Sequence, residues 1–126
     1  MRPLLFAANW KMNVGPAEAE RFASEFLVRA PEASGRDIWF FPPLVSLSAL
    51  ARALRGRADT RAGSQDTHWE PSGAFTGATS VSLAHAAGAT VGLPPGIMAS
   101  EKYGTFAEST SAAGATRCRS VLARST

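Results

Sequence analysis

The sequence has little that would support a disulfide framework, a metal site or a membrane span. It contains one cysteine, Cys118, and two widely separated histidines, His68 and His85. A single cysteine excludes an intrachain disulfide, and these residues lack the clustered spacing of a metal site. No apolar run approaches the roughly 20 residues that a membrane-spanning helix needs. We therefore expect no metal, no cofactor and no membrane partner, and a cytoplasmic, reducing compartment.

The positive net charge does not indicate a nucleic-acid-binding face. The formal net charge is +3, yet residues 1–108 contain ten acidic and ten basic residues, which sum to zero. The excess comes from Arg117, Arg119 and Arg124 in the tail, and no aromatic residue follows Phe106. A nucleic-acid-binding surface combines clustered basic residues on one face with aromatic residues. We therefore expect no nucleic-acid partner.

What the sequence does contain is an alternation of short apolar runs and helical patterns. The runs at 4–8, 38–41, 58–63 and 89–93 predict strands, and helices are predicted over about 16–30, 46–54, 79–87 and 107–124. Ser46 is predicted to cap the second helix, and Thr79 or Ser80 the third, which Gly88 closes.

Strands separated by helices form parallel pairs through right-handed crossovers. Periodicity alone leaves two folds open: a small doubly wound sheet, and half of an eight-stranded barrel, which needs about 250 residues in all. No glycine-rich phosphate loop of the G-x-G-x-x-G or Walker type occurs, which weakens a nucleotide-binding version of the first fold.

Five short segments lie at strand ends, in the approach to the fourth strand and in the long loop at about 64–78. They are N-W-K-M-N (9–13), F-P-P (41–43), A-G-S-Q-D (62–66), G-A-F-T-G (73–77) and G-A-T (88–90). In order and spacing they resemble the triosephosphate isomerase family over roughly residues 4–90. The resemblance implies an α/β fold, the (β/α)8 TIM barrel. Residues 1–126 would form a single partial TIM-barrel domain, the first four β-α units, truncated and divergent over 91–126.

Asn9 and Lys11 are the candidate site residues. Side chains alternate along a strand, so both should face one way and Trp10 the other, at the carboxyl end where barrel enzymes carry their chemistry. The family interconverts dihydroxyacetone phosphate and glyceraldehyde 3-phosphate through an enediolate. By resemblance, Lys11 would be catalytic, stabilising the growing negative charge and attracting the substrate phosphate. Asn9 would bind the same small phosphorylated sugar by donating a hydrogen bond.

The loop motif implies a homodimer. In the family this loop projects into a neighbouring subunit, which assigns Phe75, Thr76 and Gly77 to the interface. Burial against a partner would remove the apolar ring of Phe75 from water. Thr76 would reach toward the active-site lysine of the partner.

The chain departs from the family pattern after the fourth strand. The family histidine that polarises the substrate carbonyl falls on Ala99 or Gly96, depending on the alignment anchor. Glu101 and Glu108 match structural positions, and the family's general base and phosphate loops would lie beyond Thr126. This predicts impaired catalysis. Two alternatives stay open: an isomerase of a related sugar phosphate such as a tetrulose phosphate, allowed by Asp66 and Trp69, and a non-catalytic remnant that keeps only the dimer loop.

Overall fold

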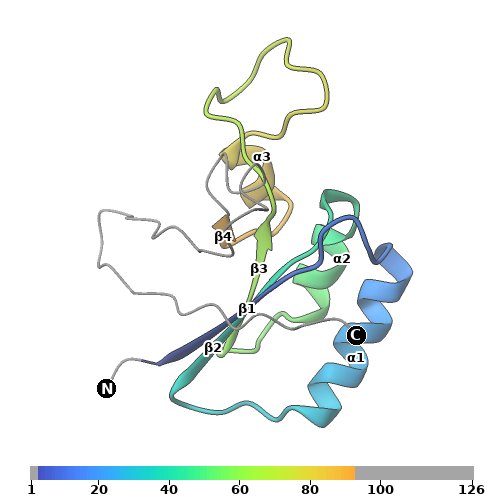
Figure 1. Cartoon of the computed structure of the whole chain (residues 1–126), viewed down its shortest axis with the longest axis vertical. Helices are drawn as coiled ribbons and strands as arrows, with labels where there is room; N and C mark the ends of the chain where they lie inside the picture. Colours follow the sequence, from blue (N-terminus) through green and yellow to red (C-terminus); the bar gives the residue numbers. More distant parts are fainter. Residues whose placement is uncertain (1–2, 93–126) are drawn as a thin grey trace, which may run out of the picture.

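The computed structural model describes residues 3–92, in which strands and helices alternate along the chain (Figure 1). The elements are β1 (Leu4–Asn9), α1 (Pro16–Arg29), β2 (Arg36–Phe41), α2 (Leu44–Ala53), β3 (Thr60–Ser64), α3 (Val81–Ala86) and β4 (Val91–Gly92). Each strand and helix predicted within this range is confirmed, with boundaries shifted by a few residues. The helix predicted over 107–124 lies outside the described residues.

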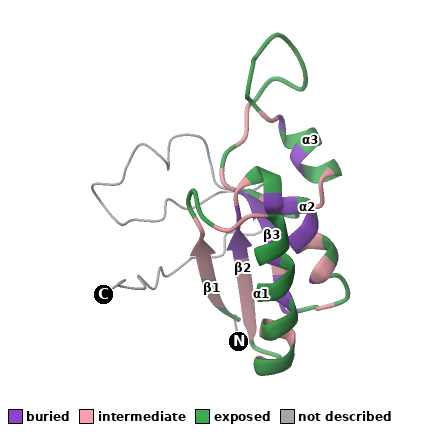
Figure 2. Ribbon diagram, turned by 90° about the vertical axis from the view of Figure 1, so that its right-hand side faces the viewer, coloured by how far each residue is buried: buried purple, intermediate pink, exposed green. Residues whose placement is uncertain are grey.

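The four strands form one sheet in chain order, β1-β2-β3-β4, and every pairing is parallel. A doubly wound sheet reverses its strand order at a switch point, and its helices cover both faces. Here the order does not reverse, and Figure 2 shows α1 and α2 on the same side of β1 and β2. The fold is that of the first β-α units of a TIM barrel, which confirms the predicted class and removes the doubly wound alternative.

The hydrophobic core lies between the sheet and the helices. Ala19 and Ala23 of α1 are fully buried, as are Leu47 and Leu50 of α2, and Phe40 of β2 joins the same cluster. The two alanines lie four residues apart and therefore on the same face of α1. Because their side chains are small, α1 packs closely against the larger side chains of α2 and β2.

Trp10 extends this core just beyond the end of β1. Its ring meets Phe22 edge-on, with centroids 5.0 Å apart, and lies 6.0 Å from Phe40. The indole therefore faces the helices. Since neighbouring residues alternate between faces, Asn9 at the end of β1 belongs to the opposite, concave face of the sheet.

Gly63 of β3 allows aromatic packing on that concave face. A Cβ at this position would lie 2.5 Å from the Phe41 ring and 2.6 Å from Cγ2 of Val91. No side chain fits at such distances, so glycine lets the Phe41 ring reach across β3 toward β4. Phe41, the last residue of β2, is 1% exposed.

The start of α2 corrects one prediction. The helix begins at Leu44, directly after Pro43, so Ser46 is the third helical residue and not its cap. The fixed φ of Pro43 favours the start of a helix directly after it. Ser46 instead points inward and donates a hydrogen bond to the Val14 carbonyl at 2.7 Å. The cap predicted for α3 is confirmed, because the Ser80 hydroxyl accepts from the Leu83 amide.

Asp59 organises the opposite end of the sheet, where the strands begin. It is 4% exposed and accepts hydrogen bonds from Arg36 Nε at 3.0 Å, Arg57 Nε at 2.9 Å and the Ala33 amide at 3.2 Å. Burial acts to raise the pKa of Asp59, but these hydrogen bonds and the charge of Arg57 outweigh it and hold the pKa below its ordinary value. The carboxylate thereby joins the segment before β2 to the segment before β3.

We predict that Asp59→Asn lowers the free energy of unfolding by about 2 kcal/mol at pH 7, because hydrogen bonds to a buried charge are lost. A carboxyl whose pKa is lowered by folding stabilises the protein above its unfolded-state pKa of about 4, and this stabilisation disappears as the pH falls through the folded-state value. Urea unfolding measured at several pH values from 7 down to 2 should therefore show that the difference in free energy of unfolding between wild type and Asp59→Asn becomes smaller as the pH falls.

The matched control is Glu25→Gln, which removes a carboxylate whose ion pair with Arg29 is largely exposed. Such pairs contribute little, so its unfolding curve should follow the wild type at every pH. A gap between Asp59→Asn and wild type that stays constant across the pH range would contradict the assignment to the Asp59 charge.

Candidate functional site

The candidate site lies at the carboxyl ends of β1, β2 and β3. Parallel pairing brings these ends to one edge of the sheet, with Asn9 paired to Phe41 and Phe40 paired to Ala62. Asn9 is the last residue of β1, Lys11 follows two residues later, and Gln65 is the first residue after β3. In barrel enzymes this edge carries the chemistry.

Asn9 and Lys11 are joined directly. The Lys11 amide donates to Asn9 Oδ1 at 2.9 Å. This bond uses the carboxamide oxygen, so Nδ2 is the end of Asn9 that can donate to a ligand. The half-buried Asn9 and the exposed Lys11 thus form one polar unit at the strand end.

The strand-like alternation of side chains between the two faces of the sheet, which was predicted to include Lys11, ends before that residue. β1 ends at Asn9, and the Lys11 backbone takes a left-handed conformation with φ 56°. Its neighbour in the loop, Val14, has φ 73°. Such conformations are unfavourable for non-glycine residues by about 1–3 kcal/mol, and they persist only where surrounding contacts enforce them. A side-chain role for Lys11 therefore depends on this turn and not on strand geometry, and it stays a prediction.

Side chains from other elements enforce the turn. Gln65 Nε2 donates to the Lys11 carbonyl at 2.7 Å and to the Phe41 carbonyl at 2.8 Å. Ser46 holds the Val14 carbonyl from α2, and within the loop Asn13 Nδ2 donates to the Trp10 carbonyl at 2.9 Å. The loop after β1 is therefore fixed from both β3 and α2. Gln65 was not predicted as a site residue, although its position one residue past a strand, in the same alternation as Gly63, is a usable signal.

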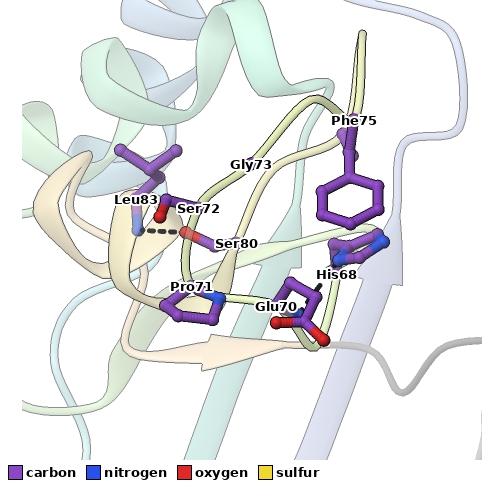
Figure 3. Close-up of a pocket in the computed structure, with 9 residues that line it drawn as sticks. His68, Glu70, Pro71, Ser72, Gly73, Phe75, Ser80 and Leu83 are labelled. Carbon is purple, nitrogen blue, oxygen red and sulfur yellow. Dashed lines mark hydrogen bonds between the residues drawn. The ribbon is translucent and has the colours of Figure 1, made fainter.

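The loop between β3 and α3 projects away from the sheet (Figure 1). Figure 3 shows the His68 ring beside Phe75, with ring centroids 4.2 Å apart. The Trp69 ring stacks on His68 at 4.3 Å, and His68 Nδ1 accepts from the Glu70 amide at 3.0 Å. His68, Glu70 and Phe75 line one side of a hollow of about 200 Å³. The loop is therefore partly self-packed around His68.

The three residues expected at a dimer interface remain exposed in this chain. Phe75 is 47% exposed, and Thr76 and Gly77 are exposed beside it. Gly73 permits the inward turn of the Phe75 ring, since its φ is 147° and a Cβ there would lie 2.7 Å from that ring. Phe75 thus has one ring face on His68 and keeps an exposed remainder.

Several sequence predictions fall elsewhere. His85 lies in α3 and pairs through Nδ1 with the Ala89 carbonyl at 3.1 Å, a local contact. Ala99, Gly96, Glu101 and Glu108 lie outside the described residues. Within residues 3–92, no group of three or more histidine, cysteine or acidic side chains is arranged to hold a metal. Over the same range, no helix is long and apolar enough to cross a bilayer.

The chain is similar in sequence to known proteins. The family model described as Triosephosphate isomerase matches residues 4–115. The chain is 41% identical over 83 residues to the triosephosphate isomerase of Synechococcus sp. (strain RCC307), which covers 65% of the chain and 32% of the relative. It is 44% identical over 82 residues to that of Symbiobacterium thermophilum, covering 64% and 31% respectively. The chain therefore spans about a third of the length of these curated relatives.

We predict that Ser46→Ala lowers the free energy of unfolding by about 1 kcal/mol, because it removes the hydroxyl that binds the Val14 carbonyl in a buried position. The matched control lies two residues along the same helix. Ser48→Ala removes a similar bond to the Ala87 carbonyl, but in an exposed position where water can replace it. Urea unfolding at neutral pH compares the two variants, and equal losses would contradict the structural role of Ser46.

Proposed function

The chain belongs to the triosephosphate isomerase family, and from that premise we propose that it contributes part of the active site of an isomerase acting on a triose phosphate. The reaction interconverts dihydroxyacetone phosphate and glyceraldehyde 3-phosphate, as in glycolysis and gluconeogenesis. The observation that carries this proposal is the Asn9–Lys11 hydrogen bond at the carboxyl end of β1, inside the segment that matches the family.

Asn9 and Lys11 would act on the charge that develops during the reaction. Removal of a proton next to the substrate carbonyl gives an enediolate, and negative charge grows on the carbonyl oxygen. A fixed cation and a fixed donor stabilise that charge without having to reorganise. Lys11 supplies the cation, which also attracts the phosphate, and Asn9 supplies the donor through Nδ2.

We propose that residues 1–126 contribute the electrostatic part of the site, through Asn9 and Lys11. The position of the polarising histidine falls on Ala99 or Gly96. General acid–base groups typically contribute 10² to 10⁴ in rate, so turnover by this chain alone should be low.

The alternative substrate is a larger sugar phosphate such as a tetrulose phosphate, and the alternative role is a non-catalytic remnant. Trp69, 76% exposed, and Asp66 are compatible with the former. The triose phosphate, which family membership favours, is the first substrate to test. A reducing, cytoplasmic location accords with the single cysteine.

We predict that Lys11→Ala lowers the turnover of glyceraldehyde 3-phosphate by about 10²-fold, because the cation opposite the developing oxyanion is lost. The matched control is Arg29→Ala, which removes one exposed positive charge at the end of α1 and should leave the rate unchanged. Rates are measured with the purified chain above a buffer blank. Equal rates for wild type and Lys11→Ala would remove the isomerase proposal and favour the remnant.

We also propose that the β3–α3 loop joins two copies of the chain. Support comes from the exposed apolar surface that Phe75 and Trp69 present on the projecting loop. Apolar surface gathered at a projecting site is typical of an interaction surface. In the dimer Thr76 and Gly77 would lie against the partner, with Thr76 near its Lys11.

We predict that Phe75→Ser weakens self-association of the chain by at least tenfold, because fully burying an aromatic side chain contributes roughly 1.5–3 kcal/mol. The control is Val81→Ser, which removes a similarly exposed apolar side chain from α3, outside the loop motif. Sedimentation equilibrium gives the dimer dissociation constant of each. A wild-type chain that sediments as a monomer, or equal weakening by both substitutions, would contradict the assignment of the interface to Phe75.

A further inference from the structure

Gln65 occupies an unusual position among the polar side chains at the strand ends. It is half-buried, and its single amide nitrogen bonds two carbonyls at once, 2.7 Å from Lys11 O and 2.8 Å from Phe41 O. A carboxamide nitrogen carries two hydrogens, so both are committed. The partners are 54 and 24 residues away in the sequence, on segments that follow β1 and end β2.

The Phe41 carbonyl accepts a second hydrogen bond. The Trp10 amide donates to it at 3.0 Å, so both of its lone pairs are occupied. Gln65 therefore completes a junction in which the ends of three strands share acceptors. If Gln65 is replaced by a side chain without a carboxamide NH₂ group, the Lys11 carbonyl or the Phe41 carbonyl loses a hydrogen-bond donor.

Lys11 is the part of the junction that has no support from strand pairing. Both polar groups of its backbone bond side chains, the amide to Asn9 Oδ1 and the carbonyl to Gln65 Nε2. These two bonds bracket a left-handed residue, φ 56°. The bond from Gln65 therefore holds the carbonyl side of a backbone conformation that lysine otherwise avoids.

We propose that Gln65 is a positioning residue, which holds the left-handed turn at Lys11 and thereby aims its ammonium group at the phosphorylated substrate. This inference rests on the proposed function of Lys11. Gln65 acts through the backbone of another residue, and its contribution should appear in ligand affinity beyond any effect on folding.

The chain offers a direct spectroscopic probe, because it contains only two lysines, Lys11 and Lys102. Labelling lysine with ¹³C at Cε gives two signals, and the spectrum of Lys11→Ala identifies which one is Lys11. Titration of the full chain with inorganic phosphate should move the Lys11 signal saturably. The Lys102 signal serves as an internal reference for non-specific effects of the added salt.

Gln65→Met retains the approximate size and neutrality of the side chain but removes both donors. We expect about tenfold weaker phosphate binding at the Lys11 signal, since small misplacements of a site group reduce its effect by up to about 10²-fold. Ser48→Ala, which removes a remote side-chain bond to a carbonyl, should bind phosphate as the wild type does. Thermal unfolding of each variant separates loss of fold from loss of positioning.

The outcomes distinguish the two proposals. Phosphate affinity in folded Gln65→Met equal to wild type overturns the positioning role and leaves the function of Lys11 intact. A wild-type Lys11 signal that does not respond to phosphate overturns both.

If Gln65→Met fails to fold, Gln65→Asn takes its place, since it keeps the amide but is one methylene shorter. Affinity at the wild-type level in folded Gln65→Asn, which cannot reach both carbonyls from the same backbone position, would also overturn the inference.

Discussion

The parallel register of β1, β2 and β3 is the constraint on which the candidate site depends. In this register Asn9 of β1 pairs with Phe41 of β2, and Phe40 of β2 pairs with Ala62 of β3. With these pairs fixed, the Phe41 carbonyl stands between the chain leaving β1 and the chain leaving β3. Hydrogen bonds from Trp10 and Gln65 then converge on one oxygen. A slip by one residue would reverse which side chains face the concave surface and would separate these groups.

The two ends of the sheet are organised differently, and the difference has a physical basis. At the amino ends, the buried Asp59 carboxylate is matched by two arginines, which gives a rigid and electrically compensated junction. At the carboxyl ends, the polar contacts are made by neutral amides and carbonyls around Lys11. These bonds hold the Lys11 backbone at its amide and at its carbonyl. The junction at the amino ends is therefore fixed by charge, and the one at the carboxyl ends by hydrogen bonds to the backbone.

Local sequence patterns predicted the helices and strands well. The features that they did not predict depend on contacts between residues far apart in the sequence. The Ser80 cap was predictable because its partner Leu83 is three residues away. Ser46 looked equally suited as a cap, but its partner Val14 lies 32 residues earlier, and no local pattern reveals that bond. Periodicity also left the strand order open, since a run of apolar residues does not specify its neighbour. Gln65 belongs to the same class as Ser46, because both of its partners are distant in sequence.

The left-handed turn at Lys11 shows how the site differs from a simple extension of β1. A continuing strand would advance by about 3.3 Å per residue and carry the lysine away from the sheet edge. The turn instead directs the Lys11 carbonyl back toward β3, within reach of Gln65. The direction of the lysine is thereby determined by the position of β3 as much as by that of β1. A change that moves β3 relative to β1, even one in the packing of Phe41 against Gly63, therefore acts on Lys11 without touching it.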